Sequence, residues 1–136
     1  MPARAFLDTN VLIYALAENE PRSAIAEELL EAGGVVSVQV LNEFTAVARK
    51  KLLLSWAEIA EAIDAFLTFC PSPVPISLEL HGAARAIAER YGYSVYDALV
   101  IAAALEAGCA VLYSEDLQDG QRIDGRITIC NPFRQK

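Results

Sequence analysis

Four acidic residues lie next to predicted secondary-structure elements at widely separated points of the chain: Asp8, Glu43, Asp97 and Asp116. Carboxylate oxygens are the ligands that Mg²⁺ and Mn²⁺ prefer in proteins, so spaced acids of this kind suggest a metal site. Several carboxylates suit one or two such ions. Two ions about 3.5 to 4 Å apart are a common arrangement for hydrolysing phosphodiester bonds, by activating a water and stabilising the leaving oxygen.

Each acid also has an ordinary structural explanation. Asp8 could cap the N-terminus of a helix, and Asp116 could begin a turn. Asp97 could complete a capping arrangement with Ser94, and Glu43 could be a solvated helix residue. Taken singly, each of these explanations is about as good as the functional one.

The placement of two acids at strand ends favours the metal site. Asp8 directly follows the apolar segment Ala5–Leu7, and Asp116 follows the apolar segment 110–113. These are the two most apolar strands that the pattern predicts, and central strands of a parallel sheet deliver their carboxyl ends to one shared edge. Asp8 and Asp116 are therefore expected to lie close together.

The surroundings of Asp97 point the same way. Asp97 falls on the same predicted helix face as Val100, Ile101 and Ala104, where a carboxylate is costly unless something binds it. If the acids converge, each pair about 4 Å apart repels by about 4 kcal/mol at an effective dielectric constant near 20. Converging acids must therefore take up protons or hold cations.

The elements that would position these acids alternate between strands and helices. Helices are predicted to start near Val11, Pro21, Val40, Ser55, Leu78 and Ser94, and strands at residues 5–7, 35–38, 110–113 and 126–129, with 74–76 as at best a short edge strand. This alternation predicts an α/β fold with a central, mainly parallel sheet flanked by helices on both faces. The chain has 136 residues, 54% of them hydrophobic, and no linker-like segment, so one domain over residues 1–136 is expected.

Composition excludes several other kinds of site. The three cysteines are odd in number and lack metal-type spacing, which predicts small buried side chains rather than disulfides or a zinc site. His81 is the single histidine and is expected on a helix surface. The first residues lack the apolar core of a secretory signal, and Glu106 and Gly108 interrupt the longest apolar tract. A cytoplasmic protein without a membrane span is therefore expected.

Four segments, in chain order, resemble the successive motifs of PIN-domain ribonucleases. They are FLDTNVL at residues 6–12, QVLNEF at 39–44, YDALVIAAA at 96–104 and LYSEDL at 112–117. Any one of them is a weak signal, whereas four in order are specific. The resemblance covers nearly the whole chain and is greatest to the VapC-type toxins of prokaryotic type II toxin–antitoxin systems, which are usually single domains of about this size.

The resemblance implies a site, an activity and partners. The four acids match the metal-binding positions of the family, Asn10 and Ser114 match polar residues that support them, and Asp119 is placed as a further supporting residue. The implied activity is Mg²⁺- or Mn²⁺-dependent endonuclease action on RNA with one or two ions. The implied partners are a second copy of the chain and a cognate antitoxin whose tail occupies the active-site groove.

The charge balance bears on both RNA and antitoxin. A net charge of −7 repels a polyanion at long range, although bound metal would mask four of the acids. Arg49 and Lys50 follow Glu43 on the same helix, with Lys50 two turns, roughly 10 Å, further along the same face. These two residues could contact RNA, or they could simply complement the helix dipole. An acidic toxin would also suit a basic antitoxin tail.

Two rival functions fit less well. A phosphatase that forms an aspartyl-phosphate could begin at a strand-end aspartate, but such enzymes usually need a second aspartate two residues on, where this chain has Asn10. A non-catalytic PIN-fold module that binds protein or RNA is the stronger alternative. Degenerate sites usually lose some of the acids, and all four are present here.

Overall fold

A four-stranded sheet forms the centre of the fold in a computed structural model that describes residues 4–18 and 20–134. The strand order is β1-β2-β4-β3, where β1, β2 and β4 are parallel and β3 is antiparallel to β4. The strands are β1 (Ala5–Leu7), β2 (Val111–Tyr113), β3 (Arg122–Ile123) and β4 (Ile127–Cys130). The predicted α/β fold with a mainly parallel sheet is thus confirmed, although β3 was not predicted.

Two predicted strands are reduced to isolated bridges. Val35 pairs with Phe6 of β1, and Ser37 pairs with Val74, both in the parallel sense. These pairings continue the parallel set beyond β1, but neither segment extends far enough to form a strand. Gly34 is needed at this junction because a Cβ atom there would lie only 2.8 Å from the carbonyl oxygen of Ala5.

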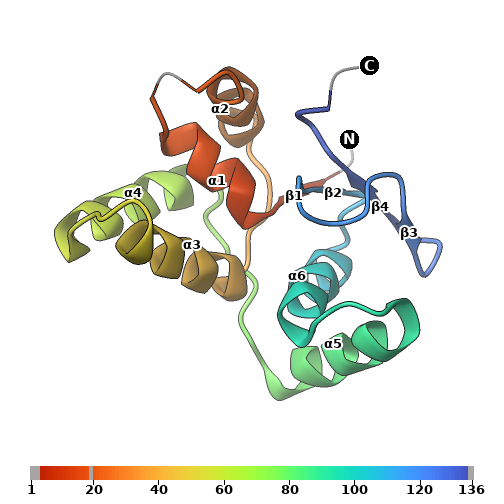
Figure 1. Ribbon diagram of the computed structural model, residues 1–136. Coiled ribbons are helices and arrows are strands. Elements are labelled where there is room, and N and C mark those ends of the chain that lie inside the picture. Colours follow the sequence, from red (N-terminus) through yellow and green to blue (C-terminus); the bar gives the residue numbers. More distant parts are fainter. Residues whose placement is uncertain (1–3, 19, 135–136) are drawn as a thin grey trace.

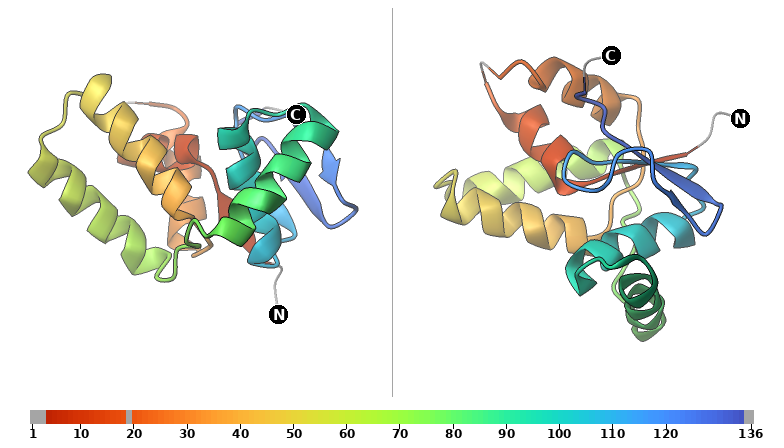
Figure 2. Two further views of the ribbon diagram at one scale, coloured as in Figure 1. Left: turned by 90° about the horizontal axis from the view of Figure 1, so that it is seen from below. Right: turned by 45° about the vertical axis from the view of Figure 1, so that its right-hand side comes forward.

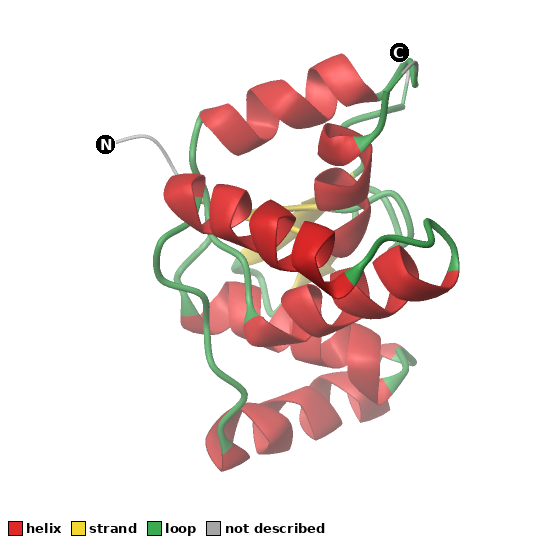
Figure 3. Cartoon of the chain, turned by 90° about the vertical axis from the view of Figure 1, so that its left-hand side faces the viewer, coloured by secondary structure: helices red, strands yellow, loops and turns green. Residues whose placement is uncertain are grey.

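Within the described residues, six helices surround the strands. In Figure 1, α1 and α2 lie above the sheet, α5 and α6 lie below it, and α3 and α4 pair at the left; Figure 2 shows the same grouping from two other sides. In Figure 3 the strands lie at the centre of the molecule, partly hidden behind the helices. The helices are α1 (Thr9–Leu16), α2 (Ser23–Glu31), α3 (Val38–Lys50), α4 (Trp56–Phe69), α5 (Leu78–Tyr91) and α6 (Val95–Glu106).

Side-chain caps explain where most helices begin. Asp8, Ser37, Ser55, Ser77 and Ser94 each accept a hydrogen bond from a backbone N–H in the first turn of the following helix. Only Ser55 completes a full capping box among these caps, with Glu58 as its partner, as predicted. Helix α2 begins two residues after Pro21, and among the residues that the structure describes no side chain caps it.

Helices α4 and α6 contribute to the core in different ways. The buried residues of α4 are Ile59, Ala62 and Phe66, whereas Trp56, the first residue of the helix, is 64% exposed. Helix α6 is buried at every position from 98 to 105, so it has no single apolar face. A helix that is enclosed on all sides is apolar all round. The predicted apolar face with Val100, Ile101 and Ala104 therefore covers only part of the buried surface of α6.

The remaining expectations about composition are met in part. Cys70 and Cys109 are buried, Cys130 is half-buried, and all three are free thiols. His81 is exposed on α5, as predicted. Within the described ranges, no helix combines the length and apolar character that crossing a membrane requires.

Candidate metal centre

Asp8 occupies the junction of β1 and α1 and is buried. Its Oδ1 atom accepts a hydrogen bond from the Thr9 N–H at 2.8 Å, and its Oδ2 atom accepts one from the Ser114 hydroxyl, also at 2.8 Å. Burial raises the pKa of Asp8 to about 6 even though these two hydrogen bonds act in the opposite direction. The negative charges of Glu43 and Asp116 contribute smaller parts of this same rise in pKa, so Asp8 is both a helix cap and a destabilised buried charge.

The loop after β2 brings Asp116 to the same edge of the sheet. The Ser114 hydroxyl oxygen accepts hydrogen bonds from the backbone N–H groups of Asp116 and Leu117, both at 3.2 Å. The Asn10 side chain lies across the loop and donates from Nδ2 to Asp116 Oδ2 at 3.3 Å. Ser114 and Asn10 therefore link Asp116 to the β1–α1 junction.

Glu43 lies on α3 with both carboxylate oxygens engaged. The Thr9 hydroxyl donates to Oε2 at 2.9 Å, and Gln39 donates from Nε2 to Oε1 at 3.1 Å. These two donors fix the plane of the carboxylate. Gln39 precedes Glu43 by four residues on the same helix, so this contact could have been predicted from the sequence. The contact from Thr9 could not, because Thr9 lies far from Glu43 in the chain.

Asp97 is half-buried in the first turn of α6. Its backbone N–H donates to the Ser94 hydroxyl at 3.2 Å, so Ser94 caps the helix as predicted. Its carboxylate makes no hydrogen bond within the described residues, and the reciprocal half of a capping box is therefore missing. Capping alone does not explain why residue 97 is acidic.

One pocket of about 390 Å³ gathers these side chains. Its walls include Glu43, Asp97 and Asp116, together with Thr9 and Asn10. Asp8 adjoins this pocket through Thr9, which contacts Glu43, and through Ser114, which supports the loop of Asp116. Three of the predicted acids thus line one pocket, and the fourth is hydrogen-bonded to the residues that contact Glu43 and support the loop of Asp116.

The donor chemistry fits a hard divalent cation. The four acids supply only carboxylate oxygens, and Asp8 is a buried charge whose ionised form a nearby cation would stabilise. Across residues 4–18 and 20–134, however, no three acidic, histidine or cysteine side chains stand together as a ready-made metal-binding group. Binding would therefore require the carboxylates to move closer together around the ion.

The other candidate residues lie elsewhere. The Asp119 carboxylate accepts a hydrogen bond from the Asn131 N–H at 2.8 Å and pairs with Arg134 at 2.9 Å, so it holds the C-terminal segment and does not line the pocket. Arg49 donates to the carbonyl oxygen of Leu54 at 2.9 Å and stacks on the ring of Trp56. Lys50 is exposed at the end of α3. Pockets of similar volume beside α5 and beside β1 gather none of the four acids.

Comparisons with known proteins identify the family and the fold of the chain. The family model of the PIN domain matches residues 5–124. A comparison with curated proteins gave no match. The structure is similar to that of VapC20 from Mycobacterium tuberculosis, described as a sarcin–ricin loop cleaving toxin, with 22% identity and a TM-score of 0.66 over 82% of this chain and 89% of that chain.

Two further solved structures share the fold. A toxin–antitoxin complex from Klebsiella pneumoniae matches with 22% identity and a TM-score of 0.72, over 96% of this chain and 99% of that chain. DNA-bound VapBC from Salmonella typhimurium matches with 21% identity and a TM-score of 0.66, over 94% and 97% of the two chains. At these identities the likeness establishes the fold.

Proposed function

The chain belongs to the PIN-domain family, and we propose that it is a Mg²⁺- or Mn²⁺-dependent endoribonuclease, the VapC-type toxin of a toxin–antitoxin pair. The observation that carries the proposal is the shared pocket, in which Glu43, Asp97 and Asp116 line the walls beside the buried Asp8. Toxin–antitoxin proteins among the structural neighbours support the biological role.

The four acids divide into ligands and a water-orienting group. Asp8, Asp97 and Asp116 would hold one or two cations, directly or through water. A bound divalent cation polarises a phosphate oxygen and lowers the pKa of an attacking water. Glu43 would orient that water and accept its proton, because Thr9 and Gln39 already fix its carboxylate, although it could also share in ligation. Attack at phosphorus then breaks the bond to the leaving oxygen of the RNA chain.

Cleavage of RNA by the purified, antitoxin-free protein tests this proposal. End-labelled transfer RNA and total RNA would be incubated with Mn²⁺ or Mg²⁺, with chelator, and with the Asp8→Asn variant as control. We expect cleavage at discrete sites that disappears with chelator and in the variant. Correctly folded protein that cleaves neither pool would favour the non-catalytic PIN-fold module that binds protein or RNA.

RNA is the proposed substrate class on two grounds. The family match supports a nuclease, and the neighbour from Mycobacterium tuberculosis is described as a toxin that cleaves the sarcin–ricin loop. Lys50, exposed two turns beyond Glu43, is the better placed of the two predicted phosphate contacts. Arg49 is already engaged with the turn after α3, so its contribution to RNA binding would require it to leave Trp56.

The proposed antitoxin is a protein with a basic segment that reaches the acidic pocket. The net charge of −7 and the cluster of carboxylates favour such a partner electrostatically. We expect the dissociation constant of the complex to rise about 10-fold between about 50 mM and about 500 mM salt, as screening shortens the reach of these charges. Titration calorimetry at the two salt concentrations measures this, and an unchanged affinity would contradict the electrostatic part of the proposal.

Two further features belong to the proposal. Leu78 and Tyr96 are 86% and 63% exposed, and these apolar side chains support a homodimer in which a second copy covers them. Sedimentation velocity of the antitoxin-free protein would give the oligomeric state. A toxin that cleaves RNA would act in the cytoplasm.

A further inference from the structure

Glu115 lies between Ser114 and Asp116 in the chain, but it faces a different set of side chains. Its Oε1 atom accepts a hydrogen bond from the Tyr14 hydroxyl at 3.1 Å. Arg22 donates from Nη1 to Oε1 at 3.0 Å and to Oε2 at 3.3 Å. Glu115 is not among the residues that line the pocket of the acids, so its carboxylate is committed to α1 and to the segment before α2.

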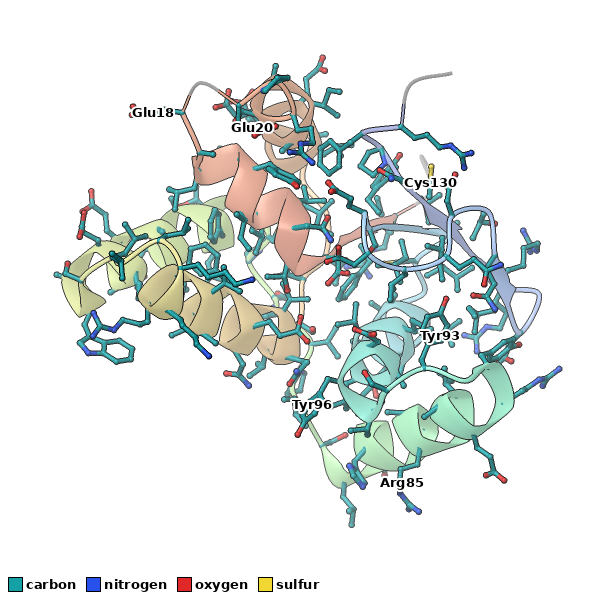
Figure 4. All side chains as sticks on the ribbon, viewed as in Figure 1. Glu18, Glu20, Arg85, Tyr93, Tyr96 and Cys130 are labelled. Carbon is teal, nitrogen blue, oxygen red and sulfur yellow. The ribbon has the colours of Figure 1, made fainter. Side chains whose placement is uncertain are left out.

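Arg22 is itself held from two other directions. Its Nε atom donates to Glu20 at 2.7 Å, and its guanidinium group lies 4.2 Å from the centre of the Tyr14 ring. That ring packs edge-to-face with the ring of Phe133, with 5.0 Å between the ring centres. Figure 4 labels Glu20 beside α2. Because neighbours hold both Arg22 and Tyr14 in place, little conformational entropy is left to lose when they bind Glu115.

The backbone of Glu115 carries this restraint to Asp116. The Glu115 N–H donates to Asn10 Oδ1 at 3.2 Å, which sets the orientation of the Asn10 amide. The other end of that amide, Nδ2, is the group that donates to Asp116 Oδ2. A continuous set of contacts therefore runs from Arg22 through Glu115 and Asn10 to the carboxylate that lines the pocket.

We propose that Arg22, Tyr14 and Glu115 form a clamp that positions Asp116 from outside the pocket and thereby sets the affinity of the site for divalent cations. The part that concerns cations rests on the function proposed above. The three clamp residues are positioning residues, because the groups that face the pocket are Asn10 and Asp116. Residues outside the ligand set that orient ligands typically change metal affinity by about 10- to 100-fold.

The clamp acts on local order more than on global stability. The ion pair between Arg22 and Glu115 is partly exposed, with 39% and 27% of the two side chains accessible. Such pairs contribute little to the free energy of unfolding, so breaking this one should barely change the melting temperature. The loop that carries Asp116 should instead open more often.

The test measures loop opening and Mn²⁺ affinity in Arg22→Gln, Glu115→Gln and the double variant. Hydrogen exchange of the Asp116 and Leu117 amides, which both donate to the Ser114 hydroxyl, reports loop opening in cation-free protein. We expect exchange about 10-fold faster and Mn²⁺ binding about 10-fold weaker in each single variant. The double variant should exchange no faster and bind Mn²⁺ no more weakly than the more affected single variant, because both changes break the same contact.

Matched variants separate positioning from general damage. Arg90→Gln breaks another exposed ion pair, 3.6 Å from Asp124, and should leave both readouts unchanged. Tyr14→Phe keeps the ring that contacts Arg22 and Phe133 but removes the hydroxyl donor, so a smaller effect is expected. Arg22→Lys should recover part of the loss, since it restores the charge without the two-point contact.

The two readouts distinguish failure of the clamp from failure of the proposed function. Wild-type exchange rates and wild-type Mn²⁺ affinity in the Arg22 and Glu115 variants would overturn the clamp. Faster exchange with unchanged Mn²⁺ affinity would overturn its role in cation binding. If the wild-type protein binds no Mn²⁺, both the proposed metal site and the role of the clamp in cation binding are rejected. Hydrogen exchange would still show whether the clamp holds the loop.

Discussion

The Asp97→Asn variant is expected to cleave RNA about 1,000-fold more slowly than the wild type, a loss equivalent to roughly 4 kcal/mol of transition-state stabilisation. Asp97 lines the pocket with a carboxylate that accepts no hydrogen bond within the described residues. Asparagine has nearly the same shape but lacks the charge that holds a cation. Single-turnover cleavage with saturating Mn²⁺ measures the rate.

The fold should survive this substitution. Ser94 caps α6 through the backbone N–H of residue 97, and that contact does not depend on the side chain. The matched control is Glu106→Gln, which removes an exposed carboxylate at the other end of the same helix and should cleave at the wild-type rate. An Asp97→Asn protein that is folded and cleaves as fast as the wild type would remove Asp97 from the mechanism.

The second large effect is a loss of stability in the cation-free protein as the pH rises. The pKa of Asp8 is about 6 in the folded state, compared with 3.8 as its ordinary value. The folded state therefore binds this proton more tightly, so its contribution is complete below pH 3.8 and is lost as the pH rises through 6. The free energy of unfolding should fall by about 3 kcal/mol because of this one group.

The Asp8→Asn variant isolates this contribution. Asparagine cannot ionise, so the difference in unfolding free energy between variant and wild type should change across this pH range by the amount that Asp8 contributes. Urea unfolding in chelator at several pH values measures that difference, and saturating Mn²⁺ should abolish most of the wild-type loss. The same variant should be inactive. A pH-independent difference would show that Asp8 is not a destabilised charge in the folded protein.

The elements around the site could be predicted from local sequence signals. Serine caps and apolar strands depend on neighbouring residues, so the starts of α4 near Ser55 and of α5 near Leu78 were correctly expected. The antiparallel β3 was missed because Arg122 and Ile123 form only two paired residues after a turn. No periodicity can be recognised in so short a segment.

The support of the acids was harder to predict than the acids themselves. Strand ends pointed to Asp8 and Asp116 because a parallel sheet brings its carboxyl ends to one edge. The contacts that hold these groups join residues far apart in the chain, as in the hydrogen bond between Asn10 and Asp116 or the ion pair between Arg22 and Glu115. Single-sequence patterns do not encode such pairings, and Glu115 would pass for a surface acid.

The most direct test of the central claim is to locate Mn²⁺ by its anomalous scattering in crystals of the antitoxin-free protein. The account predicts a Mn²⁺ peak in the pocket lined by Glu43, Asp97 and Asp116, within reach of the carboxylate oxygens of these residues or of Asp8. The Asp97→Asn protein should show no peak at that position. Crystals that contain Mn²⁺ at other positions, with none in this pocket at saturating concentration, would contradict it.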